Sequence, residues 1–451
     1  MHLTPDTKSW VEPDERGEFS IHNLPFGCFS DESSPSTRVG VRIGNYVLNM
    51  YELGKSSSEG VFPKLSGTVK DFGCSTLNSF AALGRAHHRE VRAELQSLLV
   101  ENSEHGSAMQ QDEQLYRRVF IPVEKVTMHL PMQIGDYTDF YAGYHHAYSL
   151  GVMFRGPENA LQPNYLHLPV GYHGRSSSIV VSGTPIRRPV GQILDESKSP
   201  VTGASRKLDI ELELGCFVSR PSTMGECIDV NNAEEYIFGY VLLNDWSARD
   251  IQSWEYVPLG PFNGKNFGST VSPWVVLADA LEPFRTKGID NPKQPLQNYL
   301  QEKQESRAFD IGLQVDIAGK TPTSGEDPRE LTQVFSIAQG KKYTTLSRTS
   351  SKNLIWSFPQ MIAHHTLGGC PMRTGDFFGS GTISGTESSE RGSFIEMSEA
   401  GKVDIDISEG ETRRFLEDGD SIVLRGVCEK DGRRIGFGEC EGVILPARAI
   451  S

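Results

Sequence analysis

The chain has 451 residues, a formal net charge of -14 and an isoelectric point near 5.4. Because a single core stops growing at roughly 250 to 300 residues, this length predicts two or three domains. The acidic balance, with no cluster of Lys and Arg, argues against a nucleic-acid partner. No apolar run could span a bilayer and the first residues lack a signal-peptide pattern, so we expect a cytoplasmic protein without a membrane partner.

Seven cysteines are dispersed along the chain, with no Cys-x-x-Cys pair. This pattern predicts neither a disulfide framework nor a zinc site. Cys370 follows two histidines closely, but a free cysteine is usually a small buried hydrophobe, so we do not expect it to be a nucleophile.

The first part of the chain predicts small strands and one strong helix. Residues 18–52 contain short alternating apolar runs broken by Gly, Pro and Ser, which are typical of a barrel or roll. From an expected N-cap at Thr76, apolar side chains recur at steps of three and four residues as far as Leu98. The polar stretch 101–114 precedes a change in character, so we place a boundary near residue 131. The predicted domains are 1–131 and 132–451.

Beyond residue 131, helical periodicity is scarce and β-branched runs bounded by Gly and Pro dominate. Such runs lie at 176–186, 236–246, 269–278, 309–319, 403–407, 421–428 and 433–445. Many strands at irregular spacing, joined by long loops, predict a predominantly β domain.

The stretch LDIELELGCF, residues 208–217, reads as a strand with an unusual face. Successive side chains of a strand point to opposite sides, so Asp209, Glu211 and Glu213 are expected on one face, about 6.5 Å apart. Three carboxylates at that spacing repel one another unless they face water or something positive.

Two further acids suggest what that positive group is. Asp139 lies in GDYTDFY, and Asp245 directly follows an apolar run, where an unpaired carboxylate would be costly. With Glu211 and Glu213 they would supply the hard oxygen ligands that Ca²⁺ or Mg²⁺ prefers. The alternative is a solvated strand face with Asp245 bonded to Arg249, and spacing alone leaves both interpretations open.

Two glycine-rich segments miss the phosphate-binding fingerprints. GPFNGKNFGST (260–270) has an Asn where a P-loop needs Ser or Thr, which leaves Lys265 as a cation flanked by glycines. FGSGTISG (378–385) lacks a surrounding strand–helix–strand unit, although Thr382 could hydrogen-bond a carboxylate. His145 and His146 are adjacent and therefore diverge in a strand or a helix, so at most one serves a given site.

Several long segments, taken together, resemble the fumarylacetoacetase family. They are GDYTDFY, LHLPVGYHGRSSSIVVSGTPIRRP, LDIELE, LNDWSARDIQSWEYVPLGPFNGKNFG and GSGTISG. The resemblance runs from Ile21 to Leu445 and is weakest over the first 20 residues and over 284–350. It implies a mainly β fold with a few helices, in which a small SH3-like N-terminal barrel precedes a large β-rich C-terminal domain, and it implies a homodimer.

The implied function is hydrolysis of the carbon–carbon bond of 4-fumarylacetoacetate, a small dicarboxylate diketone, to fumarate and acetoacetate. This is the final step of tyrosine and phenylalanine degradation. The resemblance assigns the catalytic histidine to His146 and its carboxylate partner to Glu396, which would orient the imidazole.

The resemblance also implies the other site residues. Ligands of Ca²⁺ or Mg²⁺ fall on Asp139, Glu211, Glu213 and Asp245, which leaves Asp209 as a spare acid. Lys265 and Ser269 fall at a second position associated with Mg²⁺. Substrate contacts fall on Tyr141, Arg155, Gln252, Tyr256 and Thr382. The residues that would stabilise the negative charge developing during the reaction are Arg249, Gln252 and Lys265.

The chain departs from the family pattern at three positions. Tyr148 and Ser149 stand where Thr and Asn are common, and Ser269 stands where Thr is frequent. The alternatives are a related enzyme (an acylpyruvate hydrolase, an oxaloacetate decarboxylase or a dienoate isomerase) and a non-enzymatic metal-binding dimer. The N-terminal barrel and the pair of His146 and Glu396 favour the full-length hydrolase.

Overall fold

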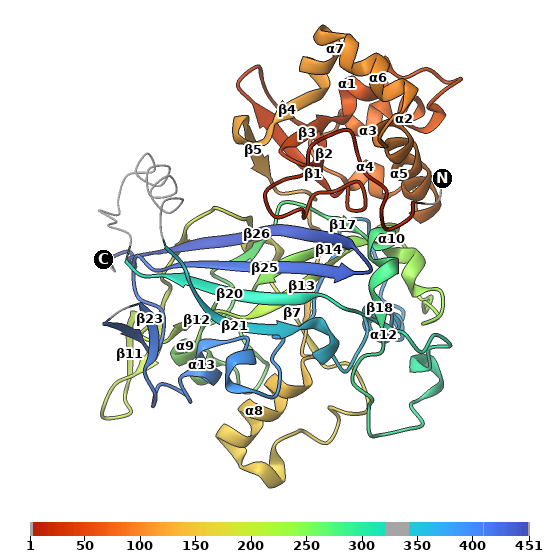
Figure 1. Cartoon of the computed structure of the whole chain (residues 1–451). Helices are drawn as coiled ribbons and strands as arrows, with labels where there is room; N and C mark the ends of the chain where they lie inside the picture. Colours follow the sequence, from red (N-terminus) through yellow and green to blue (C-terminus); the bar gives the residue numbers. More distant parts are fainter. Residues whose placement is uncertain (1–2, 321–341, 409, 450–451) are drawn as a thin grey trace.

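The computed structural model describes residues 3–320, 342–408 and 410–449. Its fold is mainly β, as predicted, with an N-terminal unit lying over a larger β-rich body (Figure 1). Strands far apart in sequence join the two, because Phe26 bridges Val275 and Phe19 bridges Ile435. Among the described residues, no helix is both long and apolar enough to cross a membrane.

The N-terminal unit combines an antiparallel sheet with short helices. The sheet order is β4-β3-β2-β1-β5. The strands are β1 (Phe26–Asp31), β2 (Ser34–Ile43), β3 (Tyr46–Asn49), β4 (Phe120–Pro122) and β5 (Val126–His129). The helices are α1 (Met50–Ser56), α2 (Pro63–Gly67), α3 (Val69–Phe72), α4 (Asn78–Ala81), α5 (Arg85–Leu99), α6 (Glu104–Gln111) and α7 (Glu113–Val119). The strands expected within 18–52 are thus confirmed.

The long helix expected from Thr76 is wrong in its first half. Two helices replace it: α4 has Leu77 rather than Thr76 at its N-cap, and α5 begins only after Gly84. Gly84 adopts φ of +84°, a conformation that other residues avoid and that interrupts a helix. The apolar periodicity continued across this break, so it could not reveal the turn.

The C-terminal body contains two large sheets. One has the order β7-β6-β22-β13-β14-β16-β8, with β17 also paired to β14, and the other has the order β21-β20-β25-β26-β9. The strands of the first are β6 (Tyr137–Phe140), β7 (Gly171–His173), β8 (Ile179–Val181), β13 (Leu212–Val218), β14 (Ile237–Asn244), β16 (Ser269–Val271), β17 (Val276–Leu277) and β22 (Phe377–Gly379). Those of the second are β9 (Ile186–Arg187), β20 (Gly312–Ala318), β21 (Thr344–Ser350), β25 (Ser421–Lys430) and β26 (Arg433–Leu445).

Shorter elements complete the body. Two-stranded pairs are β10 (Val190–Leu194) with β11 (Pro200–Ala204), β12 (Leu208–Asp209) with β15 (Ser247–Ala248), β18 (Arg285–Thr286) with β19 (Ala308–Phe309), and β23 (Ile405–Ser408) with β24 (Glu411–Arg413). The helices are α8 (Tyr144–Arg155), α9 (Arg249–Glu255), α10 (Ala278–Leu281), α12 (Phe358–Thr366) and α13 (Phe394–Met397). Every β-branched run singled out beyond residue 131 contains strand residues.

The core lies between and around these sheets, and β13 and β14 run through it with every residue buried. This explains why their apolar runs are nearly continuous rather than alternating. All seven cysteines are free, as expected, although Cys370 is exposed rather than buried.

A buried arginine joins the N-terminal unit to the body. Arg85, at the start of α5, is only 7% exposed and pairs with Asp279 at 3.1 Å and Glu282 at 2.7 Å, while its other terminal nitrogen lies 3.2 Å from Glu234. Helix α5 is thereby tied to the region of α10.

We expect Arg85→Gln to lower the free energy of unfolding by roughly 3 kcal/mol, because removing one partner of a buried ion pair strands the other charges. Denaturant titration followed by circular dichroism measures the change. Arg117→Gln is the matched control: its pair with Glu113 is exposed on both sides, so its loss should change stability by less than about 0.5 kcal/mol. Equal effects of the two substitutions would contradict the role of Arg85.

Candidate active site

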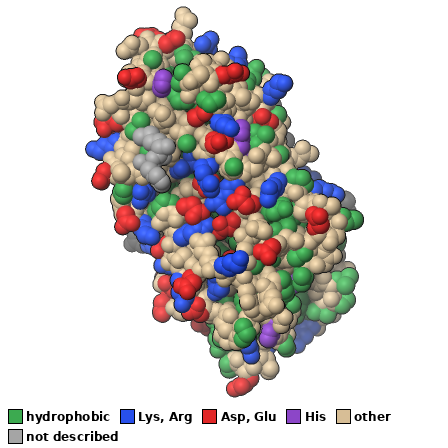
Figure 2. All heavy atoms as spheres, turned by 90° about the vertical axis from the view of Figure 1, so that its right-hand side faces the viewer, with side chains coloured by type: hydrophobic (Ala, Val, Ile, Leu, Met, Phe, Trp, Pro, Cys, Tyr) green, Lys and Arg blue, Asp and Glu red, His purple; other side chains and the backbone are tan. Residues whose placement is uncertain are grey.

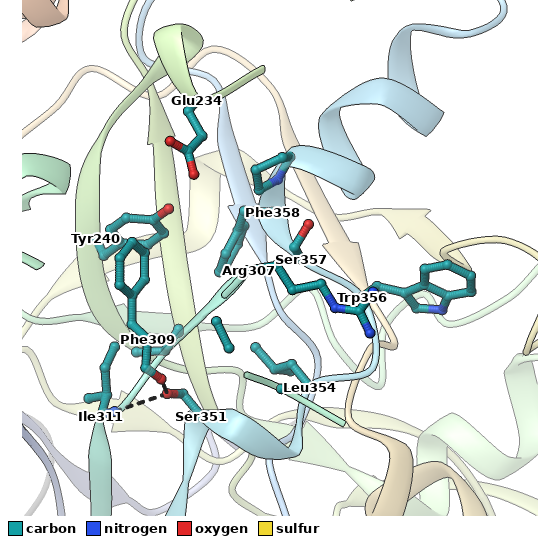
Figure 3. A pocket seen from close by; sticks show the side chains of 14 residues that line it. Glu234, Tyr240, Arg307, Phe309, Ile311, Ser351, Leu354, Trp356, Ser357 and Phe358 are labelled. Atoms are coloured by element: carbon teal, nitrogen blue, oxygen red, sulfur yellow. Dashed lines mark hydrogen bonds between the residues drawn. The ribbon is translucent and has the colours of Figure 1, made fainter. Parts of the chain in front are cut away.

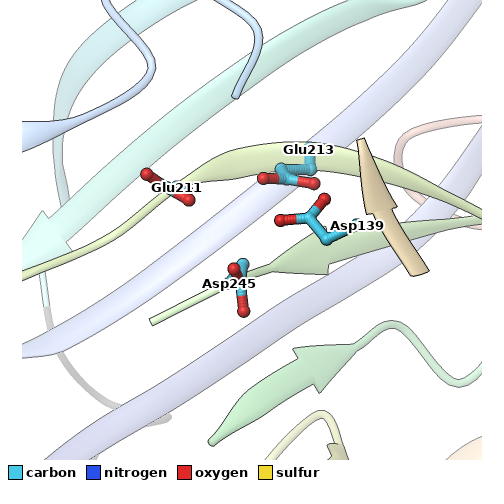
Figure 4. Close-up of side chains that lie close together, drawn as sticks. All are labelled: Asp139, Glu211, Glu213 and Asp245. Atoms are coloured by element: carbon cyan, nitrogen blue, oxygen red, sulfur yellow. The ribbon is translucent and has the colours of Figure 1, made fainter. Parts of the chain in front are cut away.

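Four carboxylates from three separate segments meet inside the C-terminal body. Asp139, Glu211, Glu213 and Asp245 each offer a ligand atom, and these atoms all lie within 4.8 Å of one another (Figure 4). None of the four residues is more than 6% exposed. The alternative of a solvated strand face is therefore wrong, and the four acids singled out from the sequence do converge.

The order of the strands explains the convergence. Asp139 is on β6 and Glu213 on β13, and β22 runs between them. Glu211 lies just before β13 and Asp245 just after β14, where the backbone N–H of Asp245 donates to the carbonyl of Glu211 at 3.2 Å. Neighbouring strands thus bring distant acids to one point.

Gly379 on β22 provides the space for two of these carboxylates. A Cβ at this position would lie 2.5 Å from Oδ1 of Asp139 and 3.0 Å from Oε2 of Glu213. Only a residue without a side chain lets the two acids approach across the middle strand.

Two cations neutralise part of this negative charge. The Lys265 ammonium, buried at 6% exposure, donates to both Glu211 and Asp245. The Arg249 guanidinium pairs with Glu211 at 2.8 Å. The alternative in which Asp245 simply pairs with Arg249 is wrong, since Asp245 instead binds Lys265 and accepts hydrogen bonds from Ser269 at 2.8 Å and Tyr172 at 3.0 Å.

The two cations do not balance the negative charge of the four carboxylates. Four acids face Lys265 and Arg249, so two negative charges remain even if both cations act on the cluster alone. Oδ1 of Asp139 and Oε1 of Glu213 are buried without a hydrogen-bond partner. Burial, followed by repulsion from Asp245, raises the pKa of Asp139 well above its ordinary value, and burial with repulsion from Asp139 does the same to the pKa of Glu213.

Glu211 behaves differently. Burial alone would raise its pKa, but Lys265 and Arg249 outweigh burial and lower the pKa of Glu211 to about 2. An ionised Glu211 beside acids with unpartnered oxygens is a donor set of hard oxygens, which suits a divalent cation of the Ca²⁺ or Mg²⁺ type. The site could hold a metal ion, and the residues present fit one.

A histidine–carboxylate pair lies next to the acids. His146, in the first turn of α8, shares a 2.6 Å hydrogen bond between its Nδ1 and Oε2 of Glu396 on α13, and its Nε2 lies 4.0 Å from Glu211. Burial would raise the pKa of Glu396, but His146 and the hydroxyls of Ser384 and Ser393 lower it, so the carboxylate stays ionised. His146 Nε2 is buried without a partner.

Some of the predicted substrate-contacting residues lie beside the catalytic groups, and others have no described contact with them. Tyr141 packs edge-on against His146, and Thr382 is buried with an unpartnered hydroxyl. Gln252 accepts a 3.2 Å hydrogen bond from Arg249. Arg155, at the end of α8, donates to the carbonyls of Asn159 and Ala160, and Tyr256 is exposed at the end of α9. No contact described for Tyr256 ties it to the acid cluster.

Asp209 is outside the carboxylate cluster, as the resemblance implied, yet its side chain makes contacts of its own. The predicted single strand is broken between β12 and β13, and the Asp209 side chain leaves the metal face. One of its oxygens accepts from Nε of Arg249 at 2.8 Å, and its carboxylate also accepts from the backbone N–H groups of Phe394 and Ile395 at the start of α13. Asp209 thus links the arginine beside Glu211 to the helix that carries Glu396.

Sequence reasoning did not find Tyr172, Ser384, Ser393 or Gly379. Isolated hydroxyls and glycines carry no pattern that distinguishes a buried site from an ordinary loop. Only the segment FGSGTISG, already singled out for its glycines, contained a usable signal for Gly379 and Ser384.

A small cavity lies on the side of β13 that faces away from Glu213. It is lined by Leu214, the neighbour of Glu213 on the strand, and by Tyr240, Phe309 and Trp356 (Figure 3). Its volume of about 40 Å³ has room for little more than water, so it is a packing defect of the core rather than a substrate site.

The fold and site together are those of an enzyme in which a buried carboxylate cluster, able to hold a metal ion, lies beside a histidine–glutamate pair. Two family models match the chain: Fumarylacetoacetase N-terminal over residues 22–131 and Fumarylacetoacetate (FAA) hydrolase C-terminal over residues 137–445. The chain belongs to the fumarylacetoacetate hydrolase family.

Close relatives span nearly the whole chain. A fumarylacetoacetase of Aspergillus fumigatus is 50% identical over 97% of this chain and 98% of its own length, and the fumarylacetoacetase of Homo sapiens is 48% identical over 97% and 99%. A solved fumarylacetoacetate hydrolase of Exiguobacterium antarcticum, 15% identical, covers 94% of this chain and 100% of its own with a TM-score of 0.50, which supports the fold.

Gly379→Ala should weaken binding of Ca²⁺ or Mg²⁺ by at least about tenfold, because the added methyl group displaces Asp139 or Glu213. Isothermal titration calorimetry measures the affinity. Gly368→Ala, in the same domain with nothing within 4 Å of its added Cβ, is the control and should bind as the unaltered protein does. Unchanged affinity in Gly379→Ala would refute the placement of the ion.

Proposed function

We propose that the protein hydrolyses 4-fumarylacetoacetate to fumarate and acetoacetate, the final step of tyrosine and phenylalanine degradation. Relatives called fumarylacetoacetase that match it at 48 to 50% identity along nearly their full lengths support this assignment. The observation that carries it is the pair of His146 and Glu396, set against a buried carboxylate cluster with two cations.

His146 is proposed as the general base. Its Nδ1 is engaged by the ionised Glu396, which leaves Nε2 as the nitrogen that takes a proton from water. Glu396 orients the ring and stabilises the imidazolium that forms. General-base assistance of this kind contributes about 10² to 10⁴ in rate.

The bond changes balance as follows. Water adds to a ketone carbon, and its proton passes to His146. The tetrahedral oxyanion then collapses, and the bond to the neighbouring carbon breaks to release an enolate. The enolate takes the proton held by His146 to give acetoacetate, which regenerates the base. The other fragment leaves as a carboxylic acid, fumarate, whose proton is released to water. Both the oxyanion and the enolate are negative, so the site must hold negative charge during the reaction.

Lys265 and Arg249 are proposed to hold that charge, with Gln252 fixed by Arg249. Their fixed positions avoid reorganisation as charge develops. Ca²⁺ or Mg²⁺ is the ion we propose for Asp139, Glu211, Glu213 and Asp245, where it would act as a Lewis acid toward substrate oxygens. The Lys265 ammonium has no lone pair, so beside a second Mg²⁺ position it would act as a neighbouring charge, with Ser269 offering a hydroxyl.

Substrate recognition is proposed to use five side chains. These are Tyr141, Arg155, Gln252, Tyr256 and Thr382. The unpartnered hydroxyl of buried Thr382 supports this, because it needs a partner that the protein itself does not provide. Arg155 could pair with a carboxylate of the substrate. Its charge acts on Tyr141, where it lowers the pKa of the phenol against the larger effect of burial.

We also propose a domain boundary near residue 131, where the character of the sequence changes, a homodimer, as the family resemblance implies, and a cytoplasmic location. The five-stranded N-terminal sheet, which ends with β5 at His129, supports the boundary.

Adding purified protein to 4-fumarylacetoacetate should cause loss of the substrate's ultraviolet absorbance, and a chelator should abolish that loss until Ca²⁺ or Mg²⁺ is restored. Oxaloacetate is the comparison substrate. Faster turnover of oxaloacetate than of fumarylacetoacetate would replace the proposal with a decarboxylase, and no turnover of either would favour the non-enzymatic alternative.

His146→Ala should lower kcat by about 10² to 10⁴ while leaving the circular dichroism spectrum and the bound metal unchanged. The same ultraviolet assay measures it. His145→Ala is the matched control, because this adjacent histidine is only half-buried and the hydrogen bond of Glu396 goes to His146 instead, so the variant should retain near-normal kcat. A normal kcat in His146→Ala would remove the general base from the mechanism.

A further inference from the structure

A second polar cavity lies at the junction of the N-terminal unit and the body, away from the carboxylate cluster. Its volume is about 430 Å³, within the range of sites for small ligands. Helix α5 contributes Arg89 and Arg92, the segment before β1 contributes His22, and β26 contributes Arg433. Figure 2 faces the side of the molecule that carries α5 and α10, and shows Lys, Arg, Asp and Glu side chains gathered across its middle.

The acids that line this cavity are already paired. Asp279 binds Arg85 at 3.1 Å and Arg89 at 2.9 Å. Glu282 binds Arg85 at 2.7 Å and Arg285 at 2.6 Å. Burial would raise the pKa of Asp279, but the arginines outweigh it and lower the pKa, as expected for a fully compensated carboxylate.

Two arginines at the cavity have no such partner. Among the described residues, no carboxylate lies within ion-pair distance of Arg92 or Arg433. Arg92 donates to the backbone carbonyl of His22 and, with the Gln96 amide turned to satisfy both groups, to the Gln96 side-chain oxygen at 2.9 Å. Arg433 donates to the backbone carbonyl of Leu3 at 3.2 Å. Positive charge is therefore in excess at this point of an otherwise acidic protein.

Of the two arginines, Arg92 gives the stronger evidence for an anion-binding site. Its Nε is buried without a hydrogen-bond partner. Burial lowers the pKa of its guanidinium to about 10, with only distant Asp279 opposing. His22 experiences the same positive field, since burial and then Arg433 and Arg92 lower its pKa. Arg92 is half-buried and its hydrogen-bond partners are all neutral, so an external anion can supply the counter-charge that the described residues do not.

We propose that this cavity binds a small anion through its phosphate or carboxylate oxygens, with Arg92 and Arg433 as the charged donors. Guanidinium groups favour such planar or tetrahedral anions because they offer several N–H donors in a fixed geometry. Arg92 belongs to the N-terminal unit and Arg433 to the body, so the anion bridges the two. The ligand then stabilises their contact without entering the catalytic site.

Equilibrium dialysis of the full chain against inorganic phosphate and, separately, succinate tests the proposal at constant ionic strength maintained with chloride. We expect saturable binding of one of these anions, accompanied by a rise in Tm that saturates over the same concentrations. Preference for phosphate or for succinate identifies the anion class. Absence of saturable binding by both would overturn the proposal.

Variants localise the binding. Arg92→Gln and Arg433→Gln should each lower the affinity by at least about tenfold, since each removes a charge-assisted hydrogen bond. Arg117→Gln, which removes one exposed charge from α7, is the matched control and should bind as the unaltered protein does. Because Arg433 lies at the start of a surface hairpin, its variant keeps the test valid if Arg92→Gln misfolds. Unchanged binding in both variants would place the anion elsewhere and refute the site.

Discussion

Burial of negative charge is the constraint on which the rest of this structure depends. Asp139, Glu211, Glu213 and Asp245 lie within a β-rich interior, where isolated carboxylates are costly and repel one another. The protein reduces that cost with Lys265 and Arg249, yet leaves oxygens without partners. A site that is only partly neutralised attracts a divalent cation strongly, and the same fixed positive groups can receive the charge that develops on a substrate.

The surrounding strands serve this cluster by bringing acids from distant segments together. Strand β22 separates β6 from β13, and the absence of a side chain at Gly379 lets acids on both neighbours share one space. Asp209 extends the arrangement, because it holds Arg249 on one side and the start of α13 on the other. One carboxylate thereby holds both Arg249, which we propose to stabilise the oxyanion, and the start of the helix that carries Glu396, the partner of His146.

The arginines at the junction of the two units have two roles, a structural contact and a proposed anion site. Arg85 is paired with three acids, Asp279, Glu282 and Glu234, and these ion pairs join α5 to the body. Arg92, seven residues further along the same helix, has no carboxylate partner among the described residues, and with Arg433 it forms the proposed anion site. One helix therefore provides a structural contact and a ligand-binding surface.

The sequence by itself determined the mainly β class and most strands, because alternation and β-branched runs are local properties. It singled out Asp139, Glu211, Glu213 and Asp245 as candidate ligands, but spacing alone did not decide between a metal site and a solvated strand face. It also favoured His146 and Glu396, but only through resemblance to a family. The turn at Gly84, the break between β12 and β13 and the pairing of Asp209 with Arg249 were decided by the tertiary structure. The turn at Gly84 separates two helices that share one apolar periodicity, so the pattern could not reveal it. The break between β12 and β13 and the pairing of Asp209 depend on which segments lie side by side, and residues far apart in the chain carry no local signal of the partners they will meet.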